Sequence, residues 1–184
     1  MTSGTPGAWG RHASRVVHAN PWFRVRADDV TRPDGRPGSY FVVETSPAAF
    51  VVALDVGGRV ALVRLHRYTV DEPSLEVPAG SVEPGEEPLA AAQRELAEEA
   101  GLVASGWRPL GLLHPANGLL AEDDHVFLAT GLADAGGHDQ AAEGITETLW
   151  MPLGDALRLA REGGITDGQT VAALALAAVE VGAR

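Results

Sequence analysis

The chain has 184 residues, which is enough for one domain with a full core and only marginally enough for two. Its formal net charge of −11 argues against binding nucleic acid through a broad basic surface, and the absence of cysteine excludes disulfides and thiolate metal sites. We find no apolar run of about 18 residues that could cross a membrane and no signal peptide. We therefore expect a cytoplasmic protein with neither a nucleic-acid nor a membrane partner.

The first two thirds of the chain are predicted to form mostly short strands and turns. Residues 1–14 resemble a flexible arm rich in glycine and small polar residues. A Pro-Asp-Gly turn and the Gly57-Gly58 pair each predict a hairpin between the strands that flank them. Apolar patterning predicts strands over residues 21–30, 39–45, 50–56, 59–68, 125–132 and 147–153.

Three helices are predicted, one in mid-chain and two near the end. The first runs over 87–100, with Pro88 in its first turn and Gly101 just beyond its end. The second covers 154–162, and the third begins near Asp167, a good N-cap residue. Short strands with one central and two final helices indicate an α+β fold or an α/β/α sandwich with a mixed sheet.

One short segment carries an unfavourable charge pattern. In "RELAEEAG", Glu95, Glu98 and Glu99 are three and four residues apart, so on a helix they share one face and repel one another. They also lie near the predicted helix end, where the dipole disfavours anions. The alternative is a solvated surface, but glycines in the preceding loop indicate a backbone shaped for close approach. Because Mg²⁺ prefers oxygen ligands and is often completed by substrate phosphates, we expect a metal site.

The surrounding segment, "GSVEPGEEPLAAAQRELAEEAGL", resembles the Nudix box, G-x5-E-x7-R-E-U-x-E-E-x-G-U with U aliphatic, at every fixed position. The matching residues are Gly80, Glu86, Arg94, Glu95, Leu96, Glu98, Glu99, Gly101 and Leu102. The resemblance implies a fold of class α/β (α+β), a Nudix α/β/α sandwich with a mixed β-sheet. It also implies Mg²⁺- or Mn²⁺-dependent hydrolysis of a nucleoside diphosphate linked to another moiety, with two or more ions per site.

The same resemblance assigns roles within the box. The implied metal ligands are the Ala79 carbonyl and the carboxylates of Glu95, Glu98 and Glu99. Glu98 and Arg94 count among the catalytic groups, with Arg94 orienting the acids. Glu86 braces the loop, and Gly80 and Gly101 are structural. A bound metal pair can activate water, neutralise a diphosphate and align an in-line attack at phosphorus.

Upstream, "LVRLHRYTVDEPSLEVPAG" resembles the segment of ADP-ribose pyrophosphatases that carries Arg-Gln-Tyr-Arg before Glu-Leu-Pro-Ala-Gly. Arg64 and Arg67 hold its arginine positions and Glu76 matches its first acid, so these three are candidate substrate-binding residues. An arginine fork suits a diphosphate clamp, whereas the plainer reading is a strand arginine paired with a surface acid. Downstream, Asn117-Gly118 stands where those enzymes carry Pro-Gly.

The resemblance to ADP-ribose pyrophosphatases also implies that an acid on the loop before the last strand is the catalytic base or an extra metal ligand. Glu143 aligns with it when one counts back from Trp150 and Pro152, and Glu147 is the alternative. The acids of the box are the other source of a base.

The N-terminal region carries the remaining expectations. Trp22 or Phe23 is a candidate to stack on adenine, although such residues more often anchor a strand. Similar enzymes swap an N-terminal sheet between two subunits, so we expect a homodimer. The expected divisions are an arm over 1–14, an N-terminal antiparallel β-sheet at the dimer interface over 15–47, and a Nudix hydrolase domain over 48–184.

The leading interpretation is a hydrolase that cleaves ADP-ribose or a related nucleoside-diphosphate sugar into a nucleoside monophosphate and a sugar phosphate. A first alternative is a Nudix hydrolase of another nucleotide, such as a dinucleotide cofactor or a nucleoside triphosphate. A second is a non-catalytic sensor of ADP-ribose, which the complete box disfavours.

Overall fold

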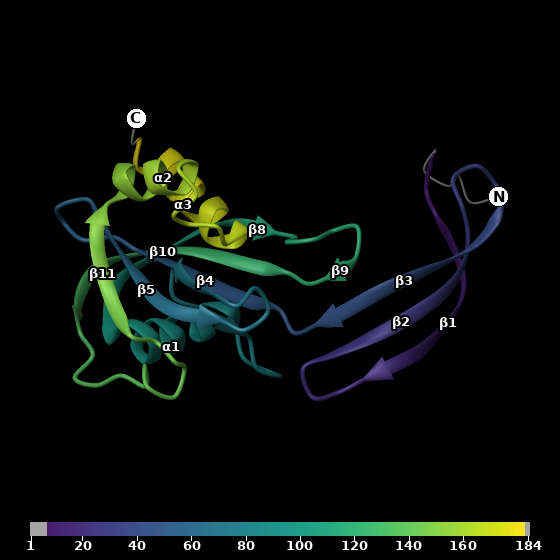
Figure 1. Ribbon diagram of the computed structural model, residues 1–184, viewed down its shortest axis with the longest axis horizontal. Coiled ribbons are helices and arrows are strands. Elements are labelled where there is room, and N and C mark those ends of the chain that lie inside the picture. Colours follow the sequence, from purple (N-terminus) through teal and green to yellow (C-terminus); the bar gives the residue numbers. More distant parts are fainter. Residues whose placement is uncertain (1–6, 183–184) are drawn as a thin grey trace. The chain divides into compact units, whose positions relative to one another are not determined.

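The computed structural model describes residues 7–182, which divide into two compact units. The first unit comprises the chain up to Ser46 together with Ala116–Glu122, and the second comprises the rest. Figure 1 labels most of the elements of both units. Within the described residues, no helix is both long and apolar enough to cross a membrane.

The first unit is one four-stranded sheet. Its strands are β1 (Gly10–Ala19), β2 (Phe23–Thr31), β3 (Pro37–Thr45) and β9 (Leu120–Ala121), in the order β1-β2-β3-β9. The first three form an antiparallel meander, which includes the first predicted hairpin, and β9 runs parallel to β3. The expected arm differs from the structure, because residues 10–14 pair with β2 as part of β1; residues 1–6 lie outside the described part.

The second unit contains two sheets. One has the order β7-β4-β10-β8 and the other the order β11-β5-β6. Their strands are β4 (Ala48–Ala53), β5 (Arg59–Arg67), β6 (Glu72–Glu76), β7 (Ala79–Ser81), β8 (Leu102–Leu113), β10 (Asp124–Asp134) and β11 (Glu147–Pro152). The first sheet is mixed, because β4 and β10 run parallel while the other pairs are antiparallel.

The second predicted hairpin is wrong. The chain turns at Gly57-Gly58, with a bridge between Leu54 and Val60 and a bond from the Asp55 N–H to the Arg59 carbonyl at 2.9 Å, but β4 and β5 belong to different sheets. The physical reason is that β4 is buried along its whole length and pairs with β7 on one side and β10 on the other. Both of its hydrogen-bonding edges are therefore taken, and β5 pairs with β6 and β11 instead.

Three helices cover the sheets in a three-layer arrangement. They are α1 (Pro88–Ala100), α2 (Leu153–Arg161) and α3 (Gly168–Val181), close to the predicted bounds. Alternate residues of β4 face opposite layers, since Val51 packs with Leu96 of α1 and Val52 packs with Leu174 of α3. Figure 1 shows α1 on one side of the strands and α2 and α3 on the other. The expected α/β/α sandwich with a mixed sheet is confirmed.

Candidate active site

The acids singled out in the sequence lie on the last turns of α1, and the helix begins after a loop that follows the strand β7. Pro88 occupies the first turn, and Gly101 ends the helix in the left-handed conformation, with φ of 67°. Its backbone N–H donates to the carbonyls of Ala97 and Leu96, so the glycine caps the helix end. The loop that precedes the helix turns at Gly85, whose φ is 85°.

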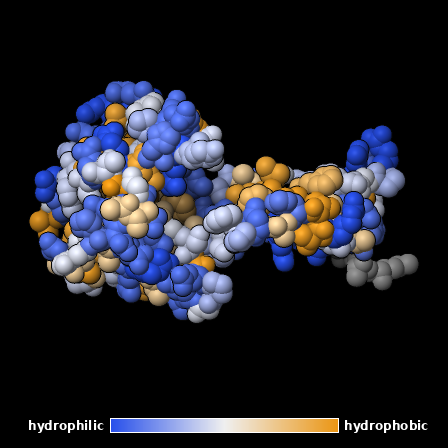
Figure 2. Space-filling view, turned by 60° about the horizontal axis from the view of Figure 1, so that its bottom comes forward, coloured by the Kyte–Doolittle hydropathy of each residue, from blue (hydrophilic) through white to orange (hydrophobic). Residues whose placement is uncertain are grey.

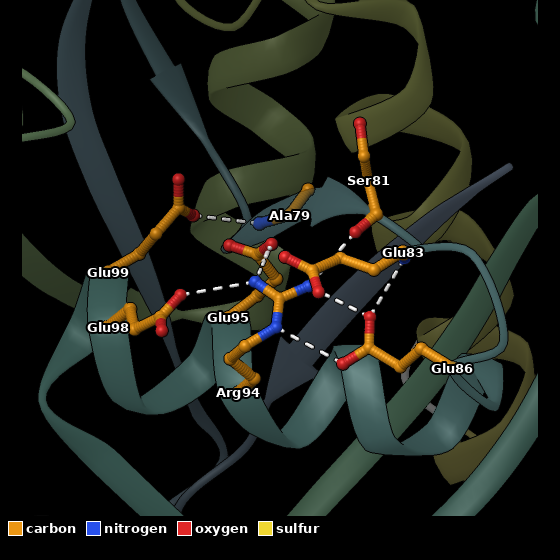
Figure 3. A network of polar contacts seen from close by, with 8 residues as sticks. All are labelled: Ala79, Ser81, Glu83, Glu86, Arg94, Glu95, Glu98 and Glu99. Atoms are coloured by element: carbon orange, nitrogen blue, oxygen red, sulfur yellow. Dashed lines mark hydrogen bonds and ion pairs between the residues drawn. The ribbon is translucent and has the colours of Figure 1, made fainter. Parts of the chain in front are cut away.

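Arg94 is the centre of the polar network in Figure 3. Its Nη1 donates to Glu95 at 2.6 Å and to Glu98 at 3.1 Å. Its Nε and Nη2 each donate to one oxygen of Glu86 at 3.1 Å, and Nη2 also reaches the carbonyl of Ser81 at 3.0 Å. One planar guanidinium thus holds three acids and the loop backbone, which explains why an arginine is suited to this position.

Glu86 closes the loop that leads into α1. One of its oxygens accepts the backbone N–H of Glu83 at 2.9 Å, in addition to the bonds from Arg94. The hydrogen bond from Arg94, followed by that from Glu83, holds the pKa of Glu86 below its usual value. Glu86 is therefore an anion that ties the loop to the helix.

Glu95 lies against the backbone of Gly80. The residue is only 8% exposed, and a Cβ added at Gly80 would overlap its carboxylate. Burial raises the pKa of Glu95, the hydrogen bond from Arg94 offsets part of that rise, and the charges of Glu98 and Glu143 add to it. The first glycine of the box is thus required for close approach of this acid.

Glu99 is the acid least supported by cations. It is 7% exposed, and one oxygen accepts the backbone N–H of Ala79 at 2.8 Å. Its pKa is raised to about 8, mainly by burial and also by the charges of Glu95 and Glu143. The bond from Ala79 and the charge of Arg67 oppose this rise. A buried carboxyl that resists ionisation at neutral pH is a typical mark of a functional site.

The donor set fits a hard divalent cation, which favours carboxylate oxygens. Among residues 7–182, no three acidic or histidine side chains already converge where they could hold a metal ion together. Arg94 engages Glu95 and Glu98, and the Ala79 amide engages Glu99. The Glu98 side chain is 42% exposed and has room to turn. Burial, and after it the charge of neighbouring acids, raises the pKa of Glu95 and Glu99, and a bound cation would favour their ionised forms.

The loop between β10 and β11 brings Glu143 to the same place. Glu143 lies in an exposed turn, and its charge raises the pKa of both Glu95 and Glu99. The alternative acid, Glu147, lies in β11 and accepts the side chain of Arg64 at 2.5 Å. Of the two candidate acids, Glu143 is therefore the one whose charge acts on the buried acids of α1.

The two candidate arginines of β5 lie on opposite faces of that strand, because they are three positions apart and successive side chains of a strand alternate between its faces. Arg67 donates to both oxygens of Glu76, at 2.8 and 2.5 Å, and the charge of Glu99 acts on it. Burial opposes ionisation of Glu76, but the bonds from Arg67 and Ser74 keep its pKa below the usual value. Arg64 lies on the face away from Arg67 and pairs with Glu147.

Trp22 belongs to the N-terminal unit. The side chain is 78% exposed, and its backbone N–H and that of Phe23 both donate to the Asn20 side chain at 2.9 Å. It lines a surface hollow of about 320 Å³ together with Ala19, Asn20, Pro21, Phe23, Arg24, Glu44, Thr45 and Ser46.

Two contributors to the site carry no sequence signal. The Ser81 carbonyl holds Arg94, but any residue type supplies a carbonyl, so residue identity could not reveal it. Gln140 bonds to the backbone of Glu99 from a loop without periodicity, and no motif marks it.

Comparison with known proteins agrees with this geometry. The NUDIX domain family matches residues 44–174, and the nucleoside diphosphate sugar hydrolase N-terminal domain matches residues 9–43. The ADP-ribose pyrophosphatase of Mycobacterium tuberculosis is 36% identical over 173 residues, covering 92% of this chain and 84% of that protein.

Two further proteins show the range of relatives. A CMP-5'-(N-acetyl-N-hydroxy-3-aminopropyl)phosphonate hydrolase of Streptomyces rubellomurinus is 33% identical over 169 residues, covering 91% of this chain and 82% of that protein. The crystal structure of an ADP compounds hydrolase superposes with a TM-score of 0.84 at 22% identity, covering 98% of this chain and 97% of that one, which supports the fold. The complete box, its geometry and these matches lead to one conclusion: the chain belongs to the Nudix hydrolases, in the group that includes the ADP-ribose pyrophosphatases.

Proposed function

We propose that this Nudix hydrolase cleaves the diphosphate of ADP-ribose, or of a related nucleoside-diphosphate sugar, with the help of Mg²⁺ or Mn²⁺. The products are a nucleoside monophosphate and a sugar phosphate. The observation that carries the proposal is the set of three acids on the last turns of α1, two of which are buried, have a raised pKa and are affected by the charge of Glu143. The names of relatives that act on ADP-ribose support this substrate class.

Glu95, Glu98, Glu99 and the Ala79 carbonyl would hold the cations, of which we propose two or more. When bound, such ions neutralise the diphosphate and lower the pKa of a water molecule. Arg94 keeps Glu95 and Glu98 in place and Gly80 admits the Glu95 carboxylate, so both residues shape the donor set without touching the substrate.

Glu143 is the proposed general base, with Glu98 as the alternative. The base accepts a proton from water while the water oxygen bonds to one phosphorus, and the bridging P–O bond breaks. The bridging oxygen leaves with the other phosphate. Arg67 is the proposed diphosphate clamp, because Glu76 fixes its guanidinium and half of the side chain stays exposed. Arg64 would contribute less, since it lies on the other face of β5.

A substrate panel with Mg²⁺ tests the reaction. The panel contains ADP-ribose, other nucleoside-diphosphate sugars, a dinucleotide cofactor, a nucleoside triphosphate and a CMP-linked phosphonate, with products identified by chromatography. We expect ADP-ribose or another nucleoside-diphosphate sugar to give the highest kcat/KM and a nucleoside monophosphate as product. Preference for a triphosphate or a dinucleotide would overturn the substrate assignment.

A second candidate substrate is a nucleotide joined to a group other than a sugar. The relative from Streptomyces rubellomurinus, whose name refers to a CMP-linked phosphonate, supports it at an identity close to that of the ADP-ribose pyrophosphatase. The chain also has Asn117-Gly118 where the ADP-ribose pyrophosphatases carry Pro-Gly, so this position does not indicate a sugar as the group joined to the nucleotide. The phosphonate arm of the panel decides between the two.

We also propose a homodimer formed through the N-terminal sheet, with Trp22 available to stack on a base. Apolar residues lie exposed on this unit, as Figure 2 shows, among them Val16, Val17 and Phe41. Exposed apolar patches of this kind are typical of protein interfaces. The stacking role of Trp22 rests on its high exposure and its place in a surface hollow.

A further inference from the structure

The loop that carries Glu143 is bonded to the C-terminal end of α1. The backbone N–H of Ala135 donates to the carbonyl of Gly101 at 2.9 Å, and that of Asp139 donates to the carbonyl of Glu98 at 2.8 Å. The last carbonyls of a helix have no partner within the helix, so they are available to an incoming segment. Here the loop residues take that place and tie the loop to the helix that carries the acids.

Gln140 makes the third of these bonds with its side chain. Its Nε2 donates to the carbonyl of Glu99 at 2.6 Å and to the hydroxyl of Thr148 in β11 at 2.8 Å. A backbone carbonyl only accepts, so the NH₂ end of the amide must face Glu99 and both of its hydrogens are used. One side chain therefore joins the loop, the helix α1 and the strand β11.

The other end of the turn is fixed by apolar packing. Ile145 is 6% exposed and packs with Val63, Leu65 and Ala100, and its backbone N–H donates to the carbonyl of Gln140 at 2.8 Å. Glu143 lies between Gln140 and Ile145, so its backbone has fixed points on both sides. A short turn held at both ends has few conformations that keep those bonds.

We propose that Gln140 is a positioning residue, which fixes the Glu143 carboxylate relative to the acids of α1 and thereby sets the rate of hydrolysis. This inference rests on the proposed function of Glu143. Gln140 acts through Glu143 and not on the substrate. The plainer alternative is that Gln140 only stabilises the fold as a helix cap. Both readings use its bond to the Glu99 carbonyl, and they differ in the effect that removing this bond has on kcat.

The test compares Gln140, on the loop, with Gln93, an exposed glutamine on α1. Gln140→Met removes both donors and keeps the length of the side chain, whereas Gln93→Met changes an exposed glutamine on α1. We expect Gln140→Met to lower kcat on the order of 10- to 100-fold, because small misplacements of a catalytic group have effects of that size. KM should stay within about threefold, and Gln93→Met should leave both constants unchanged. An unchanged kcat in Gln140→Met overturns the proposal.

A double-mutant cycle with Glu143→Gln separates positioning from simple stabilisation. If Gln140 works through Glu143, adding Gln140→Met to Glu143→Gln lowers kcat little further. If the two losses multiply, Gln140 acts independently of Glu143 and the proposal fails. Thr148→Val, which removes only one partner of Gln140, provides the milder variant if Gln140→Met folds poorly, and its loss of kcat should likewise vanish in Glu143→Gln.

Amide hydrogen exchange keeps this proposal distinct from the proposed reaction. Gln140→Met should speed exchange in a peptide that spans the loop over 137–147, and Gln93→Met should not. Equal exchange in the variant and the wild type overturns the positioning role even if hydrolysis is observed. Full activity in Glu143→Gln, by contrast, would refute the catalytic role of Glu143, and this inference would fall with it.

Discussion

At the scale of single residues, the acids of α1 are stabilised unequally. Arg94 donates to Glu86, Glu95 and Glu98 but not to Glu99, which accepts one backbone N–H from Ala79 and is affected by the charge of Arg67. The pKa of Glu99 is also raised to about 8, mainly by burial. It is therefore the acid whose ionisation depends most on a cation.

The raised pKa of Glu99 predicts a specific pH dependence of stability. When a carboxyl has a higher pKa in the folded state, folding takes up a proton between the unfolded and folded values. Without metal, stability should thus fall as pH rises from about 4.5 to about 8. Glu99→Gln removes this contribution, so its Tm in EDTA should exceed that of the wild type at pH 8 and converge with it near pH 5.

The matched control for that measurement is Glu72→Gln, which changes an exposed acid of β6. It should follow the wild-type curve of Tm against pH. If Glu99→Gln also follows the wild-type curve, then burial of Glu99 does not oppose its ionisation.

The close contact between Gly80 and the Glu95 carboxylate can be tested by substitution. Gly80→Ala places a methyl group on the Glu95 carboxylate, which must then move, so activity should fall on the order of 10- to 100-fold. Gly154→Ala is the control, because Gly154 lies in α2 with open space around it, and it should raise stability by up to about 1 kcal/mol with no loss of activity. Steady-state kinetics and thermal unfolding of both variants check this, and full activity in Gly80→Ala would contradict the close approach.

At the scale of elements, the end of α1 determines where its last acids lie. Gly101→Ala should lower stability by roughly 1–2 kcal/mol, because its φ of 67° is left-handed. Gly182→Ala is a close match, with φ of 68° at the end of α3. Both should lower Tm, but only Gly101→Ala should lower kcat, since Glu98 and Glu99 precede it. Equal kinetic effects of the two changes would argue against a special role for the end of α1.

The sequence predicted the elements whose local signals agree with their surroundings. The three helices have clear ends, at Gly101 for α1 and at the Asp167 cap of α3, whose side chain accepts the N–H of Thr170 at 2.7 Å. The strand β8 was not predicted, because Pro109 and two glycines interrupt its pattern. Its position explains them, since β8 lies at the edge of its sheet and has a register shift next to Pro109.

The residues of the site were likewise predicted only where a local pattern determines their positions. The box predicted which acids share a face, because the spacing on a helix is fixed. It could not predict which acids the Arg94 side chain would bond to. That depends on how Arg94 reaches Glu86 and the Ser81 carbonyl across the loop. Likewise, Arg64 pairs with Glu147 because the strand register places them opposite each other, which no local pattern states. Arg67 lies opposite Glu72 but bonds to Glu76 further along β6, so register alone does not give that pair either.

At the scale of the whole molecule, the N-terminal sheet supports the proposed dimer. Light scattering should give about twice the chain mass of 19.2 kDa. Val16→Asp, on an exposed position of β1, should shift the protein toward the monomer because it places a charge in the apolar interface. Val56→Asp, in an exposed turn of the other unit, should leave the mass unchanged. A monomeric wild type would refute this interface.

The account as a whole requires that the acids of α1 bind the cations that hydrolysis needs. Calorimetric titration of Mn²⁺ into the metal-free protein, with an ADP-ribose analogue that cannot be hydrolysed, measures this directly. The expected result is saturable binding by the wild type that Glu99→Gln weakens by an order of magnitude or more. Equal binding by the two proteins, or no binding by the wild type, would contradict it.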